Sequence, residues 1–466
     1  MTRRNVDLAI IGSGSGNSLI TDYWDDKQVA IAEGSTFGGT CLNVGCIPTK
    51  MFVRPAHLAR GIEEAARLGM QLAVEKVDWL AIRDRIFGRI DPISAGGEDY
   101  RKRLEHVELI SQFVTLREGK TLRAEDGTEI TAEQLVIAAG SRPTLPALEG
   151  INLDGVHTSD TIMRLAQLPE RLVIIGGGYI ACEFAAIFSA LGSEVIQLVR
   201  SGALMRHLDA EISEAYNAEA TAHWQVRYHT EARALRPADS GLDVELGGET
   251  LRADTVLVAI GRTPNTDLIG AREAGLDLHE DGRLQVDEYQ RVLRGGQPVV
   301  GTYALGDISS ETQLKHVANY EARLVAHNLE HPGELRKNSD RAVPAAVFTH
   351  PELATIGLTE QEARAQLGAE HLTVKTQKFG DTAYGWAMED RTGLFKVLAD
   401  KRTGQLVGAH AMGPEASNLI QPVIMAMNLG IDAHTAATGQ YWIHPALMEV
   451  VENALLGLDV PDSGLL

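Results

Sequence analysis

Two short apolar runs, each followed directly by a cluster of glycines, form the clearest pattern in this chain. The first run, residues 6–11, precedes Gly12-Ser-Gly-Ser-Gly, and the second, residues 171–175, precedes Gly176-Gly-Gly. Apolar runs of this length without alternation are typical of strands buried on both faces of a parallel sheet. A further apolar run follows each glycine cluster. The pattern therefore predicts two strand–turn–helix–strand units.

The glycine turns predict nucleotide binding. A glycine turn lets the backbone approach a pyrophosphate, which the amides and dipole of the following helix N-terminus stabilise. One such turn is weak evidence, whereas two in the same setting indicate two separate sites. Asn17 stands where the pattern usually has its third small residue, so we expect slightly looser helix packing there. The turn residues expected to contact nucleotide are Gly12, Gly14, Ser15, Gly16, Gly176 and Gly178.

The two units differ in charge where their second strands end. The first ends in Glu33, 21 residues after Gly12, where a carboxylate would accept hydrogen bonds from ribose hydroxyls. The second strand, residues 194–199, is followed by Arg200 and later by Arg206, without an acidic residue at its end. Guanidinium groups suit a ribose 2′-phosphate, which favours NADP over NAD. The alternative is that both arginines are solvated surface residues.

The remaining apolar runs suggest how the domains are completed. Runs at 135–143 and 256–264 both end in Gly-x-x-Pro, as if each closed one of two related nucleotide domains. Another strand leads to Asp307, whose carboxylate could hold a ribityl or ribose hydroxyl. From about Arg341 the pattern becomes that of an antiparallel sheet with helices, with strands expected at 344–348, 395–398 and 406–410 and helices near 417–429 and 445–456. We predict an α/β fold with two Rossmann-like nucleotide-binding domains and a C-terminal α+β domain.

Composition narrows the classes of function. The chain has 466 residues, 44% of them apolar and 23% charged, which is ordinary for a globular protein of three or more domains. A net charge of −20 argues against nucleic acid as the main partner, because phosphate binding needs a basic face. No run approaches the ~18 apolar residues of a membrane span, and the N-terminal run is too short for a secretory signal. With three cysteines, we expect a protein of the reducing cytoplasm.

Two of those cysteines, Cys41 and Cys46, lie five residues apart behind the first nucleotide unit. In an ideal helix, residues five apart point about 140° away from each other, so a ring between them needs a distortion. Gly45 and Pro48 supply a permissive residue and a helix-breaking residue. We interpret the pair as redox-active; two inert buried thiols are the alternative. Zinc ligation lacks a second ligand pair at suitable spacing, and no metal is expected. Cys182, in an apolar helix, is expected to be inert.

Six segments in order along the chain resemble the glutathione-reductase and lipoamide-dehydrogenase class of flavin disulfide oxidoreductases (class I pyridine nucleotide-disulfide oxidoreductases). They are the two glycine turns, the Cys41–Cys46 segment, Gly306-Asp307, Phe348-Thr-His-Pro-Glu352 and the terminal His444-Pro-x-x-x-Glu449. The resemblance covers essentially the whole chain and implies FAD and NADPH as cofactors. It implies an FAD-binding domain at 1–150, an NADPH-binding domain at 151–270, a second FAD-binding or central part at 271–340, and a dimerisation (interface) domain at 341–466.

The resemblance also implies an NADPH-dependent reductase of a low-molecular-weight disulfide. Cys46 would form the charge-transfer thiolate beside the flavin, and Cys41 would exchange with the substrate disulfide. His444 would be the acid–base partner of Cys41, with Glu449 fixing its tautomer. Family members take this histidine from the partner subunit, so we expect an obligatory homodimer. An ordinary interface histidine is the alternative for His444.

Other residue roles follow from the same resemblance. Lys50 would stabilise the anionic reduced flavin and Glu183 would balance its charge; ordinary helix-surface charges are the alternative. Tyr179 resembles a gate over the nicotinamide pocket, although it would be unremarkable as a core aromatic. Further expected cofactor contacts are Gly39, Thr40, Gly140, Asp307, Lys315 and His316 on the flavin side, and Ile180, Gly261 and Arg262 on the NADPH side.

Two competing functions remain open at this point. An NAD-dependent dihydrolipoamide dehydrogenase would share the flavin and cysteine chemistry, but such enzymes usually carry an acidic residue where Arg200 stands. A flavoprotein with a binding or scaffolding role would leave the cysteines inert.

Overall fold

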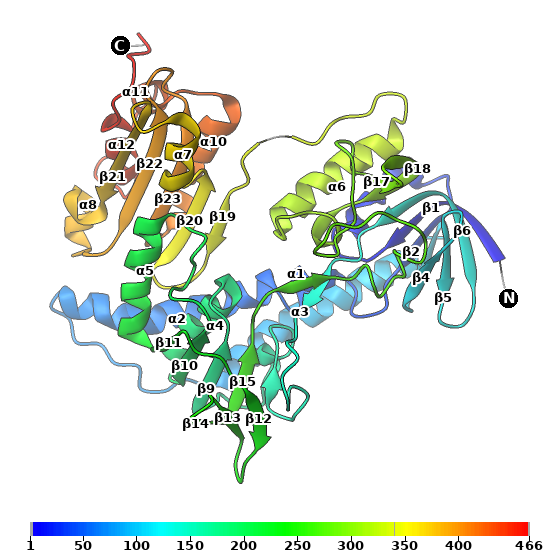
Figure 1. Cartoon of the computed structure of the whole chain (residues 1–466), viewed down its shortest axis with the longest axis horizontal. Coiled ribbons are helices and arrows are strands. Elements are labelled where there is room, and N and C mark those ends of the chain that lie inside the picture. The colour runs from blue at the N-terminus through cyan, green and yellow to red at the C-terminus, as the bar shows by residue number, and fades with distance from the viewer. Residues whose placement is uncertain (1–2, 340, 465–466) are drawn as a thin grey trace.

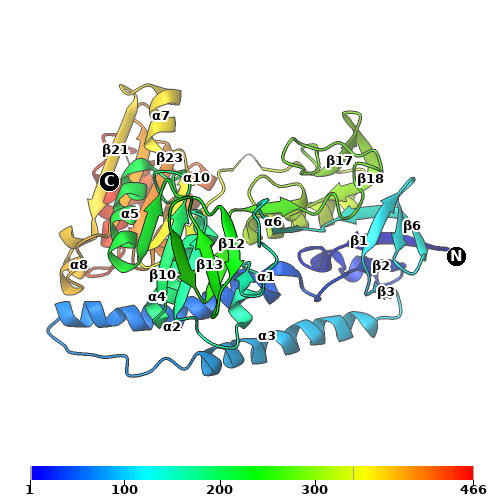
Figure 2. The ribbon, with the colours of Figure 1, turned by 60° about the horizontal axis from the view of Figure 1, so that its bottom comes forward.

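The computed structural model describes residues 3–339 and 341–464, which form three parts, each built on its own sheet (Figure 1). The sheet with β1 and β6 lies at the N-terminal end of the molecule, the sheet with β9 and β10 forms the second part, and β20 to β23 form the third. The long helices α2 (Cys46–Arg67) and α3 (Trp79–Lys102) run along one side of the molecule (Figure 2). They connect the N-terminal part to the second part, because α2 packs against both α3 and α4.

The first sheet is mainly parallel, in the order β17-β18-β6-β1-β2-β3, with β4 and β5 adding an antiparallel extension to β6. On β1, Leu8 and Ile10 enter one hydrophobic core while Ala9 and Ile11 enter another, so the strand is buried on both faces as predicted. The strands are β1 (Arg3–Ile11), β2 (Val29–Ala32), β3 (Val107–Ile110), β4 (Val114–Arg117), β5 (Thr121–Ala124), β6 (Glu129–Ile137), β17 (Arg291–Arg294) and β18 (Gln297–Ala304).

The helix predicted after the first glycine turn is wrong in extent. The chain forms a 3₁₀ turn, η1 (Gly16–Leu19), and another, η2 (Asp22–Trp24), before β2. Ser18 Oγ bonds Ser15 O at 2.7 Å, and short polar side chains of this kind compete with helical hydrogen bonds. We expected Asn17 to stand where the turn approaches the strand most closely. That position is held by Gly16 instead, where a Cβ would lie 2.8 Å from Ile10. The close approach of turn and strand therefore belongs to Gly16.

The second glycine unit matches its prediction closely. Its parallel sheet has the order β11-β10-β9-β15-β8, and a separate antiparallel sheet joins β12, β13 and β14. Helix α4 (Tyr179–Leu191) begins directly after the glycines and is predominantly apolar. The other elements are β8 (Val156–His157), η3 (Ile162–Arg164), β9 (Arg171–Ile175), β10 (Glu194–Val199), α5 (Ala210–His223), β11 (Gln225–Tyr228), β12 (Ala234–Pro237), β13 (Leu242–Glu245), β14 (Thr250–Ala253) and β15 (Thr255–Val258).

The two Gly-x-x-Pro segments pair with each other. Strands β7 (Ser141–Pro143) and β16 (Arg262–Pro264) form a two-stranded antiparallel ribbon. Gly140 O accepts from Asn265 N at 3.0 Å, and Gly261 O accepts from Thr144 N at 2.9 Å. This ribbon is where the chain leaves the first sheet for the second and where it returns.

The C-terminal sheet is antiparallel as predicted, in the order β19-β20-β23-β22-β21. The predicted helix at 417–429 is divided in two, and the one predicted at 445–456 begins only at Glu449. No helix in the described ranges is both long and apolar enough to cross a membrane. The remaining elements are α1 (Gly39–Asn43), η4 (Gly306–Ile308), α6 (Lys315–Glu330), β19 (Ala345–Val347), β20 (Glu352–Gly357), α7 (Glu360–Leu367), β21 (Leu372–Lys378), η5 (Phe379–Asp381), α8 (Ala383–Ala387), β22 (Leu394–Asp400), β23 (Leu406–Gly413), α9 (Ala416–Leu419), α10 (Gln421–Leu429), α11 (Ala433–Thr438) and α12 (Glu449–Leu456).

Candidate active site

The two cysteines lie on either side of a break between helices. Cys41 is in α1, and Cys46 is the first residue of α2. Gly45 forms the break, and a Cβ there would lie 2.9 Å from Thr40 O, so a side chain would crowd the turn. Pro48 lies in the first turn of α2, where its missing N–H costs little, so the helix-breaking role expected for it is wrong. Gly45 is therefore the residue that suits the break.

The arrangement makes Cys41 acidic. The neighbouring Cys46 thiol, helped by Lys315 and by the amides of Cys46 and Ile47, lowers the pKa of Cys41 to about 7 against the effect of burial. The same interaction between the two thiols raises the pKa of Cys46. Amides at a helix N-terminus stabilise a thiolate. The pair therefore favours one thiolate at neutral pH, on Cys41.

Lys50 and Glu183 both lie near the cysteines but do not form an ion pair with each other. Lys50 Nζ lies 3.4 Å from Glu352 Oε1 and 3.5 Å from the centre of the Phe348 ring. Glu183 accepts a hydrogen bond from Phe348 N at 2.9 Å. Burial raises the pKa of Glu183 to about 7, while that hydrogen bond and Lys50 oppose the shift. The direct pairing expected between the two is thus replaced by a cluster that includes Phe348 and Glu352.

His444 and Glu449 lie close together, away from the cysteines. His444 Nδ1 is 2.7 Å from Glu449 Oε1, and the histidine side chain is 70% exposed. Glu449 Oε2 accepts from Ala383 N at 3.0 Å, which anchors the carboxylate. Helix α12 packs on α11, β21 and β22, whereas α1 packs on α2 and α3. Figure 1 shows α12 and α1 in different parts of the molecule.

The first glycine turn forms a cradle that side chains would fill. Gly12 has a φ of +100°, and a Cβ there would collide with Ala138 O. A Cβ on Gly39 would lie 2.6 Å from the Cα of Gly14, so the turn and the start of α1 touch through bare backbone. Lys315 Nζ donates to Ser15 Oγ at 2.8 Å, which puts a cation at the same turn. Bare backbone with a nearby cation fits the diphosphate of a dinucleotide such as FAD.

Glu33 lies at the end of β2, as predicted, and holds the turn together. Its Oε2 accepts from Ser13 N at 3.0 Å and Ser13 Oγ at 2.6 Å, while Oε1 accepts from Ser35 N at 2.9 Å and Ser35 Oγ at 2.8 Å. Both oxygens are thus occupied by serines within the chain. Contact with a ribose stays a prediction, and it would require a serine hydroxyl to give way.

The residues expected around the flavin end fall into two groups. Asp307 accepts from Ser141 Oγ at 2.6 Å, and Arg262 donates to Ser141 Oγ at 2.8 Å and to Ser141 O at 2.7 Å. Arg262 therefore bonds the ribbon directly and approaches Asp307 at 3.9 Å. His316 instead contacts Pro344 O at 2.8 Å, at the start of the third part. Thr40 is exposed in α1, near the cysteines.

The second turn requires glycine at two positions. A Cβ on Gly176 would collide with Ala259 O, and one on Gly177 would lie 2.9 Å from Val199, whereas Gly178 faces open space at the start of α4. Tyr179 and Ile180 open that helix, and burial raises the pKa of Tyr179.

The two arginines after β10 are exposed. Arg200 is 82% exposed and lies 3.9 Å from Glu231, and Arg206 is also exposed. Both guanidinium groups are therefore accessible to a ligand phosphate.

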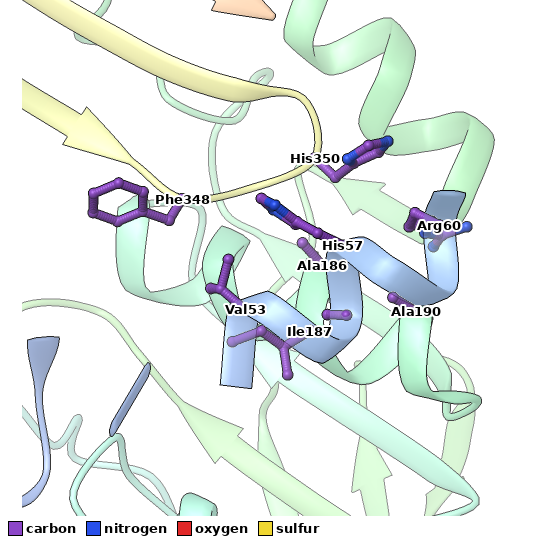
Figure 3. A pocket seen from close by; sticks show the side chains of 9 residues that line it. Val53, His57, Arg60, Ala186, Ile187, Ala190, Phe348 and His350 are labelled. Atoms are coloured by element: carbon purple, nitrogen blue, oxygen red, sulfur yellow. The ribbon is translucent and has the colours of Figure 1, made fainter. Parts of the chain in front are cut away.

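A small pocket at the junction of the three parts was missed in the sequence. His57 on α2, Ala186 and Ile187 on α4, and Phe348 and His350 in the segment before β20 line it (Figure 3). Burial lowers the pKa of His350 to about 4, and the neighbouring His57 adds to the effect. The site residues that were also missed are Ser13, Ser141, Gly177 and Glu352; all four stand inside segments already identified, so adjacency to a motif was the available signal.

Comparisons with known proteins agree with this arrangement. The family model for pyridine nucleotide-disulphide oxidoreductases matches residues 6–322, and its dimerisation-domain model matches residues 343–455. A mycothione reductase of Mycobacterium tuberculosis is 50% identical, covering 97% of this chain and 99% of its own. A dihydrolipoyl dehydrogenase of Haloferax volcanii is 32% identical, covering 96% of each chain.

A solved structure gives the same fold. The HOCl-induced flavoprotein disulfide reductase RclA from Escherichia coli superposes with a TM-score of 0.85 at 25% identity, covering 97% of this chain and 99% of its own. With both family models spanning nearly the whole chain, the assignment rests on full-length similarity. The chain belongs to the pyridine nucleotide-disulphide oxidoreductase family.

Proposed function

We propose that this chain is an NADPH-dependent flavoprotein that reduces mycothiol disulfide (mycothione) to mycothiol. The observation that carries the substrate is the 50% identity to a mycothione reductase along nearly the whole of both chains. The acidic thiol of Cys41 supports the reaction class, because a thiolate at neutral pH is the nucleophile of disulfide exchange. The exposed Arg200 and Arg206 support NADPH over NADH.

In the proposed reaction, the first glycine turn would hold FAD, which would supply the two-electron chemistry that links NADPH to the Cys41–Cys46 disulfide. The Cys41 thiolate then attacks one sulfur of the substrate, forming a mixed disulfide and releasing the first product as a thiolate, which takes a proton from His444. Cys46 passes its proton to His444 and attacks the Cys41 sulfur, which restores the disulfide and releases the second product as a thiolate that His444 protonates in turn. The structure favours Cys41 over Cys46 as the thiolate of the free pair, so the charge-transfer role of Cys46 stays a prediction.

We propose that His444 acts on the cysteines of the partner subunit of a homodimer. The ring is exposed, it belongs to the segment matched by the dimerisation model, and it lies apart from the Cys41 of its own chain. The buried Glu449 would keep Nε2 free for proton transfer by accepting from Nδ1. A cytoplasmic location is part of the proposal, because the reaction uses reduced thiols and NADPH.

We propose domain boundaries at 1–150, 151–270, 271–340 and 341–466. Sheet membership supports them, since the first sheet takes its strands from residues 3–137 and 291–304, the second from 156–258 and the third from 345–413.

The test is NADPH oxidation by the purified protein with mycothiol disulfide, glutathione disulfide and lipoamide in parallel, repeated with NADH. Selective turnover of mycothiol disulfide with NADPH supports the proposal. Turnover of lipoamide with NADH would identify a dihydrolipoamide dehydrogenase instead.

A further inference from the structure

Arg101, near the end of α3, is buried against the first glycine turn. Its Nε donates to Asn17 Oδ1 at 2.7 Å and its Nη2 donates to Asn17 O at 2.9 Å. The residue is only 8% exposed. An arginine buried to this extent needs its donors and its charge satisfied.

The hydrogen bonds of Arg101 take the place of a helix bond. Asn17 follows Gly16 in η1, where a continuing helix would bond Asn17 O to Thr21 N. Thr21 N bonds Leu19 O instead, at 3.1 Å, because the helix stops after one turn. Arg101 donates to both the backbone carbonyl oxygen and the side-chain oxygen of Asn17. It thereby fixes the backbone that directly follows Gly16.

The charge of Arg101 has no carboxylate partner. Among the described residues, no Asp or Glu forms an ion pair with its guanidinium group, and its polar contacts at Asn17 are neutral. The nearest aromatic contact is Tyr100, with its ring centre 5.3 Å away. Burial lowers the pKa of Arg101, as expected for a cation without a counter-charge.

A second cation reaches the same turn from another helix. Lys315 on α6 donates to Ser15 Oγ at 2.8 Å, two residues before Asn17. The carboxylate of Glu33, which also contacts this turn, accepts hydrogen bonds from Ser13 and Ser35. Cations from α3 and α6 thus converge on residues 15–17, beside a cradle of bare backbone. This charge distribution favours a dianionic ligand.

We infer that Arg101 is a positioning residue for the diphosphate of FAD, which it serves by fixing Asn17 and by adding positive charge at the turn. The inference rests on the proposed function, in which FAD is the cofactor. Arg101 lies outside the glycine motif. It acts where the chain forms the short η1 in place of the helix expected after the glycine turn.

The test measures FAD affinity by the flavin fluorescence released when the full-length holoenzyme is diluted. Arg101→Met should raise the Kd for FAD at least about tenfold, the loss of one charge-assisted interaction. Arg101→Lys should give an intermediate Kd, because it keeps the charge but not the two-point contact. Arg103→Met is the matched control, since Arg103 is exposed two residues further on, and its Kd should equal that of the wild type.

Asn17→Asp distinguishes a role for the charge of Arg101 from a merely structural role. It also keeps the inference testable if the Arg101 variants fail to fold. The new carboxylate would pair with Arg101 and keep its hydrogen bonds, so the thermal stability of the flavin-free chain should not fall. The Kd for FAD should nevertheless rise at least about tenfold, because the positive charge is neutralised. An unchanged Kd in Asn17→Asp would overturn the inference. If the wild type itself bound no FAD, the proposed function would fail instead.

Discussion

Oε1 of the buried Glu449 lies 2.7 Å from Nδ1 of His444, a ring that is 70% exposed. This carboxylate oxygen has no hydrogen-bond partner among the described residues, while its twin accepts from Ala383 N. A buried carboxylate in a fixed position therefore lies within reach of an exposed imidazole. Such a pair suits proton transfer to a group brought by another subunit, because the carboxylate that can orient the ring comes from the same chain.

Replacing this acceptor should slow thiol exchange selectively. Glu449→Gln is expected to lower disulfide turnover by roughly 10²-fold, the size of a general acid–base contribution, because the ring loses its orienting carboxylate. Reduction of the enzyme by NADPH, followed by flavin absorbance under anaerobic conditions, should remain at the wild-type rate. Glu452→Gln, on the same helix, is the control. Equal loss in both half-reactions would contradict a role confined to exchange.

The acidity of Cys41 predicts how the reduced enzyme is alkylated. Its pKa of about 7 means that the thiolate fraction rises through pH 7 and levels off above it, whereas an ordinary cysteine would still gain thiolate up to about pH 9. The rate of inactivation by iodoacetamide should therefore reach half its maximum near pH 7. Lys315→Met should move that midpoint upward, because Lys315 lowers the pKa of Cys41.

A cysteine control distinguishes this thiol from the others. Burial raises the pKa of Cys182 to about 12, so Cys182→Ser should leave the pH profile unchanged. Cys41→Ser should abolish the phase with a midpoint near pH 7. A midpoint near pH 9 in the wild-type enzyme would show that Cys46 and the helix amides do not stabilise the Cys41 thiolate.

The elements that could be predicted from the sequence are those whose neighbouring residues share the same degree of burial. The later residues of β1 and β9, Leu8–Ile11 and Leu172–Ile175, are apolar without alternation because both faces of each strand are covered, and the pattern is unambiguous there. The turn at Gly176 was predicted for the same reason, because strand, glycines and apolar helix follow each other directly. The cysteine pair was recognised from spacing, and Gly45 was correctly identified as the residue that permits the distortion.

The failures concern contacts between segments far apart in the chain. Lys50 contacts Glu352, 302 residues away in another part, and no local pattern encodes that choice of partner. At the short η1 after the first turn, Arg101 donates from α3 to Asn17 O, a carbonyl that a longer helix would bond within itself. Pro48 was misjudged because a proline in a first helical turn and one that ends a helix look alike in sequence.

Coenzyme preference should depend on Arg200. Arg200→Glu is expected to lower kcat/KM with NADPH by about tenfold or more while changing the value with NADH far less, because a carboxylate would repel the 2′-phosphate. The measurement is the ratio of the two kcat/KM values at constant ionic strength. Arg252→Glu, on β14, is the control for the change in net charge. A wild type that preferred NADH would contradict the role assigned to Arg200.

Glu183 should make stability depend on pH between about 4.5 and 7. Its folded pKa is raised to about 7 by burial, from an ordinary value of 4.5. In that window the unfolded chain has released this proton while the folded chain still binds it, so stability falls as pH rises. Glu183→Gln is neutral in both states and keeps an oxygen for Phe348 N.

The Tm of Glu183→Gln relative to the wild type should therefore increase from pH 4.5 to pH 7. The corresponding gain in free energy of unfolding is on the order of 3 kcal/mol at most. Glu334→Gln changes an exposed glutamate and should show no such trend. A Tm difference that stays constant across the window would mean that Glu183 is ionised in the folded chain.

Lys396 should be the most sensitive single charge at the contact between the second and third parts. It is 2% exposed, and its Nζ lies 2.9 Å from Asp209 Oδ1, 3.1 Å from Glu211 Oε2 and 2.7 Å from Glu360 Oε2. Asp209 and Glu211 begin α5, whereas Glu360 begins α7. One buried lysine thus neutralises carboxylates from both parts.

Lys396→Met should lower the free energy of unfolding by about 3–5 kcal/mol, because it leaves the fully buried carboxylate of Asp209 without its cation. Lys401→Met removes an exposed lysine that lies 2.9 Å from Asp459 and should cost under about 1 kcal/mol. Adding Asp209→Asn to Lys396→Met should recover part of the loss, since it removes one of the unpaired charges. Equal destabilisation by the two lysine variants would show that the carboxylates find other partners, and the contact between these parts would then not depend on Lys396.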